Sequence, residues 1–113
     1  MTDTITWNQF SQIEMRVGTV IQVNPFPEAQ KPAYKLTIDF GKEIGIKKTS
    51  AQITKRYAPE QLLHKQVVAV VNFPAKQIAN FMSECLILGA VDQEGDVVLL
   101  QPESLVSNGL RIL

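Results

Sequence analysis

Apolar residues recur at every second position along two stretches of this chain, and this period limits the folds that it can adopt. In residues 13–23 every odd-numbered position except Thr19 is apolar. In residues 34–40 every even-numbered position is apolar. A period of two is typical of a β-strand with one buried face. We therefore predict two strands, the first of which has a bulge or sharp bend at Gly18 and ends at Pro25 and Pro27.

Three further strands are predicted downstream. After a turn at Gly41-Lys42, a third strand begins at Ile44 and pairs back on the second. Its alternation slips over residues 50–53, as in a bulged strand. Residues 67–71 are apolar throughout, which indicates a strand covered on both faces. Residues 84–91 form the fifth predicted strand, and turns at residues 93–96 and 108–109 lead into the apolar segments 97–100 and 110–113.

The predicted helices are short. Thr6 and Gln9 fit a capping box, which predicts a helix from Thr6 to about Ile13. Residues 58–63 read as one or two helical turns, with Pro59 at the first helical position. Since no helix is long enough to cover a parallel sheet, we predict an all-β fold, a five-stranded OB-fold barrel with short helices and N- and C-terminal extensions. An SH3-like barrel with extensions is the alternative.

The length of 113 residues indicates a single domain. We divide it into a helical extension (1–12), a barrel (13–91) and a C-terminal hairpin and extension (92–113). The first four residues lack a signal-peptide pattern, Cys85 is the only cysteine, and no apolar run is long enough to span a bilayer. We therefore expect a cytoplasmic protein without membrane insertion.

The charges are unevenly distributed although the net charge is zero. Residues 44–83 carry six basic residues and one acidic residue (+5), whereas residues 84–113 carry five acidic residues and one basic residue (−4). The first 43 residues carry four basic and five acidic residues (−1). The molecule is either polarised, with a basic middle segment, or mixes the two signs in space when the barrel forms. The sequence leaves both arrangements open.

The chain offers little for catalysis. A nucleophile pair could be built only from Cys85 and His64, and a single histidine rules out a His-rich metal site. Cys85 lies among apolar strand residues, which is typical of a buried inert thiol, and His64 follows the second short helix, where it would stabilise the helix end. No phosphate-binding glycine motif is present. We expect a protein that is not an enzyme and has no catalytic residue, metal or cofactor.

Residues 72–84, NFPAKQIANFMSE, show no clear period and are read as a surface loop, where function is often found. The loop would place apolar side chains beside Lys76. These side chains could cap the core, stack on nucleobases or form a groove for an extended polypeptide. We favour the polypeptide, since the net charge is zero and the basic residues are few. The candidate polypeptide-binding residues are Phe73, Pro74, Ile78, Phe81 and Met82.

Three blocks of sequence, residues 13–41, 50–62 and 70–90, resemble the signature blocks of the tRNA-binding-domain family. The segments FPEAQKPAYKL (26–36) and DFGKEIGIKKTSAQITKRY (39–57) are most similar to the CsaA branch of that family. The resemblance implies an OB-fold homodimer that binds tRNA or unfolded and precursor polypeptides. It also links the chain to protein secretion.

The resemblance is weakest where the family contacts tRNA. Ala51-Gln52 replaces a Ser-Gly pair, and Asn80 replaces a glycine, although asparagine can adopt the positive φ that such a turn needs. By matching position, the RNA-binding candidates implied by the family are Asn72, Lys76, Ser83 and Glu84, with Lys35 and Lys48 on flanking strands.

A dimer is also expected from the residues themselves. Residues 67–71 are apolar on both faces, yet a small barrel has only one interior. The N-terminal helix and the apolar C-terminus could cover the outer face, either within one chain or across a twofold axis. The predicted dimer interface consists of Trp7, Phe10, Val68, Val70, Leu110 and Ile112. We thus expect a chaperone-like binding protein, with tRNA binding or a module for one fixed partner as alternatives.

Overall fold

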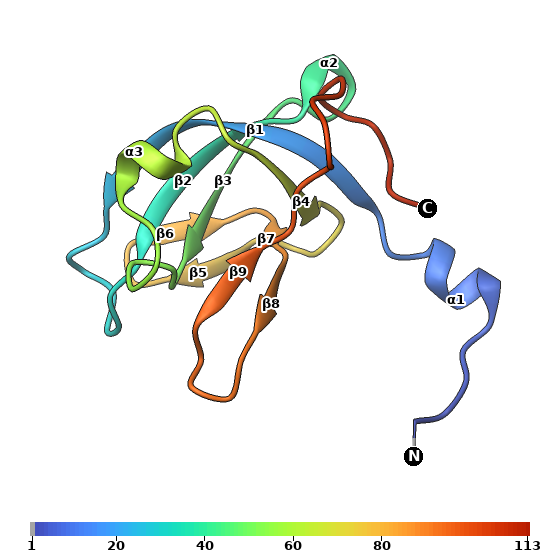
Figure 1. Cartoon of the computed structure of the whole chain (residues 1–113), viewed down its shortest axis with the longest axis horizontal. Coiled ribbons are helices and arrows are strands. Elements are labelled where there is room, and N and C mark those ends of the chain that lie inside the picture. Colours follow the sequence, from blue (N-terminus) through green and yellow to red (C-terminus); the bar gives the residue numbers. More distant parts are fainter. Residues whose placement is uncertain (1) are drawn as a thin grey trace.

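The centre of the molecule is a five-stranded antiparallel sheet with strand order β3-β2-β1-β4-β7, which curls into a nearly closed barrel (Figure 1). The structure is a computed structural model and describes residues 2–113. The strands of this sheet are β1 (Met15–Pro25), β2 (Tyr34–Asp39), β3 (Ile46–Ala51), β4 (Gln66–Val70) and β7 (Leu86–Ile87). This arrangement confirms the predicted all-β OB-fold.

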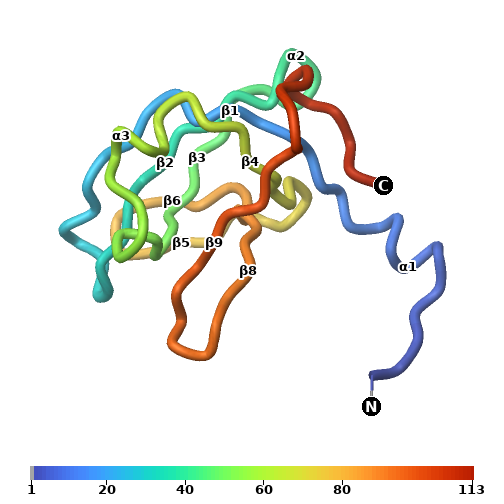
Figure 2. The backbone as a smooth tube through the Cα atoms, in the orientation of Figure 1, coloured from blue at the N-terminus to red at the C-terminus, as the bar shows by residue number. Residues whose placement is uncertain are grey.

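Two hairpins and three short helices are attached to the barrel. The hairpins are β5 (Lys76–Ile78) with β6 (Phe81–Ser83), and β8 (Gly89–Val91) with β9 (Val97–Leu99). The helices are α1 (Trp7–Ser11), α2 (Gly41–Ile44) and α3 (Pro59–Leu62). Figure 2 shows that α1 and the β8–β9 hairpin both project away from the barrel. No helix in residues 2–113 is long and apolar enough to cross a membrane.

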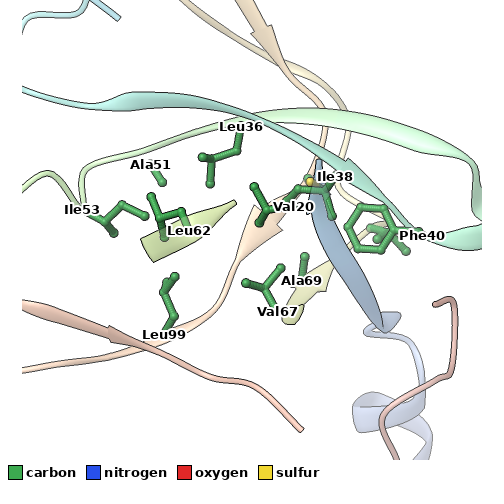
Figure 3. Close-up of a cluster of buried hydrophobic side chains, with 12 residues drawn as sticks. Val20, Leu36, Ile38, Phe40, Ala51, Ile53, Leu62, Val67, Ala69 and Leu99 are labelled. Carbon is green, nitrogen blue, oxygen red and sulfur yellow. The ribbon is translucent and has the colours of Figure 1, made fainter. Parts of the chain in front are cut away.

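The core fills the barrel with alternate side chains of β1, β2, β3 and β4 (Figure 3). Leu62 of α3 is fully buried in this cluster, which explains why a helix of one turn is retained between β3 and β4. Pro59 occupies the start of α3, as predicted, because its missing N–H needs no helical partner there. Truncating Leu62 to alanine would cost about 2–5 kcal/mol of stability by leaving a cavity.

The barrel closes between β3 and residues 83–85 through mixed backbone and side-chain bonds. The Glu84 N–H donates to the Lys48 carbonyl at 2.7 Å, and the Glu84 carboxylate accepts from the Lys48 N–H at 2.9 Å. The buried Thr49 hydroxyl donates to the Cys85 carbonyl at 2.7 Å. These bonds satisfy backbone groups that a regular ladder would otherwise pair.

The irregularity of β1 lies further along the strand than predicted. The register with β2 shifts between Val20 and Gln22, and not at Gly18. As a result, Val20 is fully buried whereas Ile21 is 40% exposed. Gly18 is needed for a different reason, since a Cβ atom there would lie 2.6 Å from the Ile38 side chain and 2.7 Å from the Phe40 ring.

Some other predicted details of the helices and strands differ as well. The capping box of Thr6 and Gln9 is present, but α1 ends at Ser11. The turn at Gly41 is a helical turn, α2, and β3 then runs from Ile46 to Ala51, where it ends without a bulge. The predicted fifth strand is divided, because the Leu88 N–H donates to β4 while its carbonyl accepts from Leu100. Leu88 thus connects β7 to the β8–β9 hairpin.

The prediction that β4 is covered on both faces is confirmed, and residues of the same chain provide this cover. All residues of β4 are buried, including Val68 and Val70 on the side away from the core cluster. The C-terminal segment pairs with β1, with bonds from Gly109 N–H to the Val17 carbonyl (2.7 Å) and from Ile112 N–H to the Met15 carbonyl (2.9 Å). The C-terminus is therefore docked on its own barrel.

Candidate functional site

Residues 72–84 contain a β-hairpin and are not the loop that the sequence predicted. Ile78 pairs with Phe81 across a two-residue turn, and the positive φ falls on Ala79 (52°) instead of Asn80. Ile78, Phe81 and Ser83 are half-buried, whereas Gln77 and Met82 are exposed. The hairpin therefore has one face towards the barrel and one towards solvent.

An apolar groove lies beside this hairpin, with a volume of about 540 Å³. Phe73 and Leu86, which are 55% and 48% exposed, contribute large apolar surfaces to it. Among the described residues that line it, Lys76 alone carries a charge. We call this site the apolar groove, and its lining residues are Thr49, Ser50, Phe73, Pro74, Ala75, Lys76, Ile78, Ser83, Cys85 and Leu86.

A second groove of about 500 Å³ adjoins the first and shares Ser50, Lys76 and Ile78 with it. It lies between β5 and residues 26–33, the connection between β1 and β2. Its lining includes Glu28 and Lys31 in addition to Lys76, so we call it the polar groove. The two grooves meet at β5.

Lys35 and Lys48 lie on the β2–β3 face of the barrel, together with Phe81. The Lys35 Nζ atom is 5.0 Å from the Phe26 ring centre and 5.7 Å from the Phe81 ring centre. Lys48 is exposed and lines the same shallow groove of about 270 Å³ as Lys35 and Phe81. We call this region the lysine face, and OB-folds commonly bind oligonucleotides on the strands that form it.

The structure divides the predicted polypeptide-binding residues between two places. Phe73, Pro74 and Ile78 line the apolar groove. Phe81 packs edge-on against Phe26, with ring centres 5.4 Å apart, and Met82 lines a shallow groove with Lys48.

Leu86 also lines the apolar groove, but the sequence analysis did not predict it as a site residue. Its place in the sequence, next to the buried Cys85 in an alternating strand, could have indicated an exposed apolar side chain.

Several predicted RNA-binding residues hold the barrel together. The Asn72 amide donates to the Gln12 carbonyl at 2.7 Å and accepts from the Glu14 N–H at 3.0 Å. The Ser83 hydroxyl lies 3.0 Å from that of Thr49. Lys35, Lys48 and Lys76 make no ion pair within residues 2–113. Of the RNA-binding candidates, the three lysines therefore have side chains available for a ligand.

The basic middle segment is partly neutralised by the acidic C-terminal hairpin. Arg56 donates three bonds to the Asp96 carboxylate, the shortest at 2.6 Å, and Lys55 Nζ lies 4.0 Å from the Glu94 carboxylate. The bond from Arg56 and its charge lower the pKa of Asp96, and the pKa of Arg56 is raised in turn. The charges are therefore mixed in space at this point of the barrel, which the sequence had left open.

This ion pair predicts a specific pH dependence of stability. Because the pKa of Asp96 is lowered in the folded state, the stabilisation is present above its ordinary value of 3.8 and is lost as the pH falls through the folded value. Asp96→Asn should abolish that loss, so the variant's melting temperature should fall less than the wild type's on acidification. Glu94→Gln, at the longer Lys55 contact, should behave as the wild type. Equal acid sensitivity of the wild type and Asp96→Asn would contradict this role.

Cys85 is buried, as predicted, and its burial raises the pKa of the thiol to about 12. The thiolate, which is the reactive form, is therefore scarce at neutral pH.

His64 is exposed in the turn after α3, where its backbone N–H donates to the Val20 carbonyl at 2.8 Å. Within residues 2–113, no three His, Cys, Asp or Glu side chains group closely enough to hold a metal ion.

Comparison with known proteins identifies the family of this barrel. Residues 15–111 match the family described as "Putative tRNA binding domain". The chain belongs to this tRNA-binding-domain family. It is CsaA-like, with 51% identity and a TM-score of 0.93 to the crystal structure of chaperone CsaA from Bacillus anthracis. That comparison covers 98% of this chain and 100% of the other.

Two further relatives show how widely the domain is used. The CsaA chaperone protein from Picrophilus torridus is 53% identical, with a TM-score of 0.91 over 97% of this chain and 100% of that one. The methionine–tRNA ligase of Porphyromonas gingivalis is 33% identical over 96% of this chain. The chain spans only 15% of the length of that ligase. The same fold therefore occurs as a separate chain and within a larger enzyme.

Proposed function

We propose that this chain is a cytoplasmic, non-enzymatic, chaperone-like protein that holds unfolded or precursor polypeptides and is linked to protein secretion. The observation that carries the proposal is the apolar groove, with exposed Phe73 and Leu86 and one charged lining residue. Filling it with one large apolar side chain would contribute about 2 kcal/mol. Such weak, non-directional binding suits a protein that must accept many clients and release them. The high identity to two chains named as chaperones supports the same function.

An aggregation assay tests this function. A chemically denatured client diluted into buffer should stay in solution when this chain is present at near-stoichiometric ratio. Light scattering that rises equally fast with and without the chain, together with submicromolar tRNA binding at physiological salt, would reverse the proposal.

A second candidate function, tRNA binding, is favoured by the lysine face. Lys35 and Lys48 lie beside the half-buried ring of Phe81, which combines phosphate-binding charges with an aromatic surface. If this face binds tRNA, the lysines contact phosphates, and affinity depends steeply on salt and little on sequence.

The lysine face makes a measurable prediction for tRNA binding. Changing Lys35 and Lys48 to alanine should lower the slope of log affinity against log salt by about one for each phosphate that the protein no longer neutralises. Lys76→Ala is the matched control, because Lys76 lines the two grooves beside β5 instead. A slope that falls for Lys76→Ala but not for the double variant would place the RNA at those grooves and not on the lysine face.

We also propose that the chain is a homodimer. Trp7 on α1 is 68% exposed. Within residues 2–113 its one aromatic contact is a tilted one with Phe10 of the same helix, with ring centres 5.4 Å apart. The docked C-terminus leaves Leu110 and Leu113 exposed as well. A twofold axis would cover these surfaces on both subunits at once. Val68 and Val70 are already buried within one chain, so the proposed contact consists of α1 and the C-terminus.

A further inference from the structure

Strand β5 has one paired edge and one open edge. It hydrogen-bonds to β6, and within residues 2–113 no strand pairs with its other side. Ile78 and Phe81 flank the two-residue turn and therefore form a hydrogen-bonded pair, so the next pair, Gln77 and Met82, is not hydrogen-bonded. It follows that the N–H and C=O of Gln77 point away from β6, towards the open edge.

This open edge borders both grooves. Lys76 and Ile78 line the apolar and the polar groove alike, and Gln77 lines the polar one. A strand added beside β5 would run along the line where the two grooves meet. Because alternate side chains of a strand point to opposite faces, such a strand could direct apolar side chains towards Phe73 and polar ones towards Lys31.

The edge carries features that limit uncontrolled pairing. Strand β5 is three residues long, its first residue is the exposed Lys76, and Pro74 precedes it closely. Natural proteins use short edge strands, lysine and proline to prevent edge-to-edge aggregation. In β5 these three features restrict an added strand to about one residue pair on either side of Gln77. The N–H and C=O of Gln77 remain available for pairing. Pairing of this length is weak and reversible.

We propose that a client polypeptide binds as an added β-strand on the open edge of β5, paired with the peptide group of Gln77. The proposal rests on the proposed function and specifies the conformation of the client in the apolar groove. Bonds to a peptide backbone are the same for every sequence, so one site can accept many clients while the groove selects for an apolar side chain. The polar groove is lined by Lys31 and Lys76 against Glu28, which favours an acidic over a basic neighbouring residue.

The test uses a dye-labelled nine-residue peptide with the central sequence Val-Phe-Val and one flanking Glu. A second peptide has the same side chains but is N-methylated at every central amide, so it cannot donate to a strand. Affinities are measured by fluorescence anisotropy. We expect the N-methylated peptide to bind about tenfold more weakly, because one or two hydrogen bonds are lost.

Two variants of this chain test the same hydrogen bonds by changing the protein instead of the peptide. Gln77→Pro removes the outward N–H without removing a β5–β6 hydrogen bond. This variant should bind the unmodified peptide about tenfold more weakly than the wild type does. Gln77→Ala is the comparison for the side chain, since it removes the same side chain, with its bond to the Ala79 carbonyl, but keeps the N–H, and it should bind the unmodified peptide about tenfold more tightly than Gln77→Pro does. A thermal melt establishes that each variant is folded, and the pair of peptides decides the matter if Gln77→Pro does not fold.

The outcomes separate this proposal from the proposed function. Equal affinity of both peptides for the wild type would contradict the proposal that the client binds as an added strand. The apolar groove would still bind polypeptide in that case. Absence of binding by either peptide at millimolar concentration would contradict both. If Gln77→Pro changes the mass of the assembly but not peptide affinity, the edge pairs with a second copy and the proposal is wrong.

Discussion

A chain carrying Phe73→Asp and Leu86→Asp should keep its fold but lose most of its ability to hold a denatured client. Both side chains line the apolar groove and are about half exposed, so a carboxylate at either place remains solvated when no client is bound. When an apolar client segment enters, two charges must lose water without gaining a partner. We expect a loss of at least about 2 kcal/mol of binding free energy, or about 30-fold in affinity.

Leu105→Asp provides the matched control for this prediction. Leu105 is 85% exposed and lies outside the apolar groove, so aspartate there adds a negative charge to the surface without changing the site. The control should suppress aggregation as the wild type does. Full holding activity in the double variant would show that clients bind elsewhere on the molecule.

Trp7→Asp should convert a dimer of about twice 12.6 kDa into monomers at low micromolar concentration. Trp7 lies outside the core, and the capping box of Thr6 and Gln9 remains, so α1 itself should persist. In a twofold dimer each substitution acts twice. A loss of about 2 kcal/mol per subunit would therefore raise the dissociation constant about 1000-fold.

Sedimentation equilibrium measures this change directly. Deleting residues 110–113 is a second perturbation, but it also removes the bonds of Leu110 and Ile112 to β1, so Trp7→Asp is the cleaner variant. Ile46→Asp, an exposed apolar residue on β3, is the control and should remain dimeric. A wild-type monomer at these concentrations would end the dimer proposal.

The barrel could be predicted because each main strand has its own local signal. Alternation identified β1 and β2, and the all-apolar run identified β4. The position of the β1 irregularity could not be predicted, since Val20 and Ile21 are equally apolar and only pairing with β2 decides which one is buried. The period of two locates a strand but does not detect an extra residue within it.

The site was predicted only in part, and the hairpin explains why. Its turn uses Ala79 at positive φ, which no sequence rule for tight turns anticipates, so β5 and β6 were read as a loop. Without the hairpin register, Phe81 and Met82 could not be separated from Phe73 and Ile78. The bonds of Asn72 to residues 12–14 join parts of the chain far apart in sequence, and such long-range pairs leave no local pattern.

The most direct test of the central claim is site-specific photo-crosslinking from the apolar groove in living cells. A benzophenone side chain replaces Phe73 in one variant, Lys48 of the lysine face in a second and Leu105 in a third. Irradiation at position 73 should yield many adducts that are sensitive to protease and resistant to nuclease, with few adducts at position 105. Nuclease-sensitive adducts at position 73, or a single protein adduct in fixed ratio, would contradict a groove that holds unfolded polypeptides.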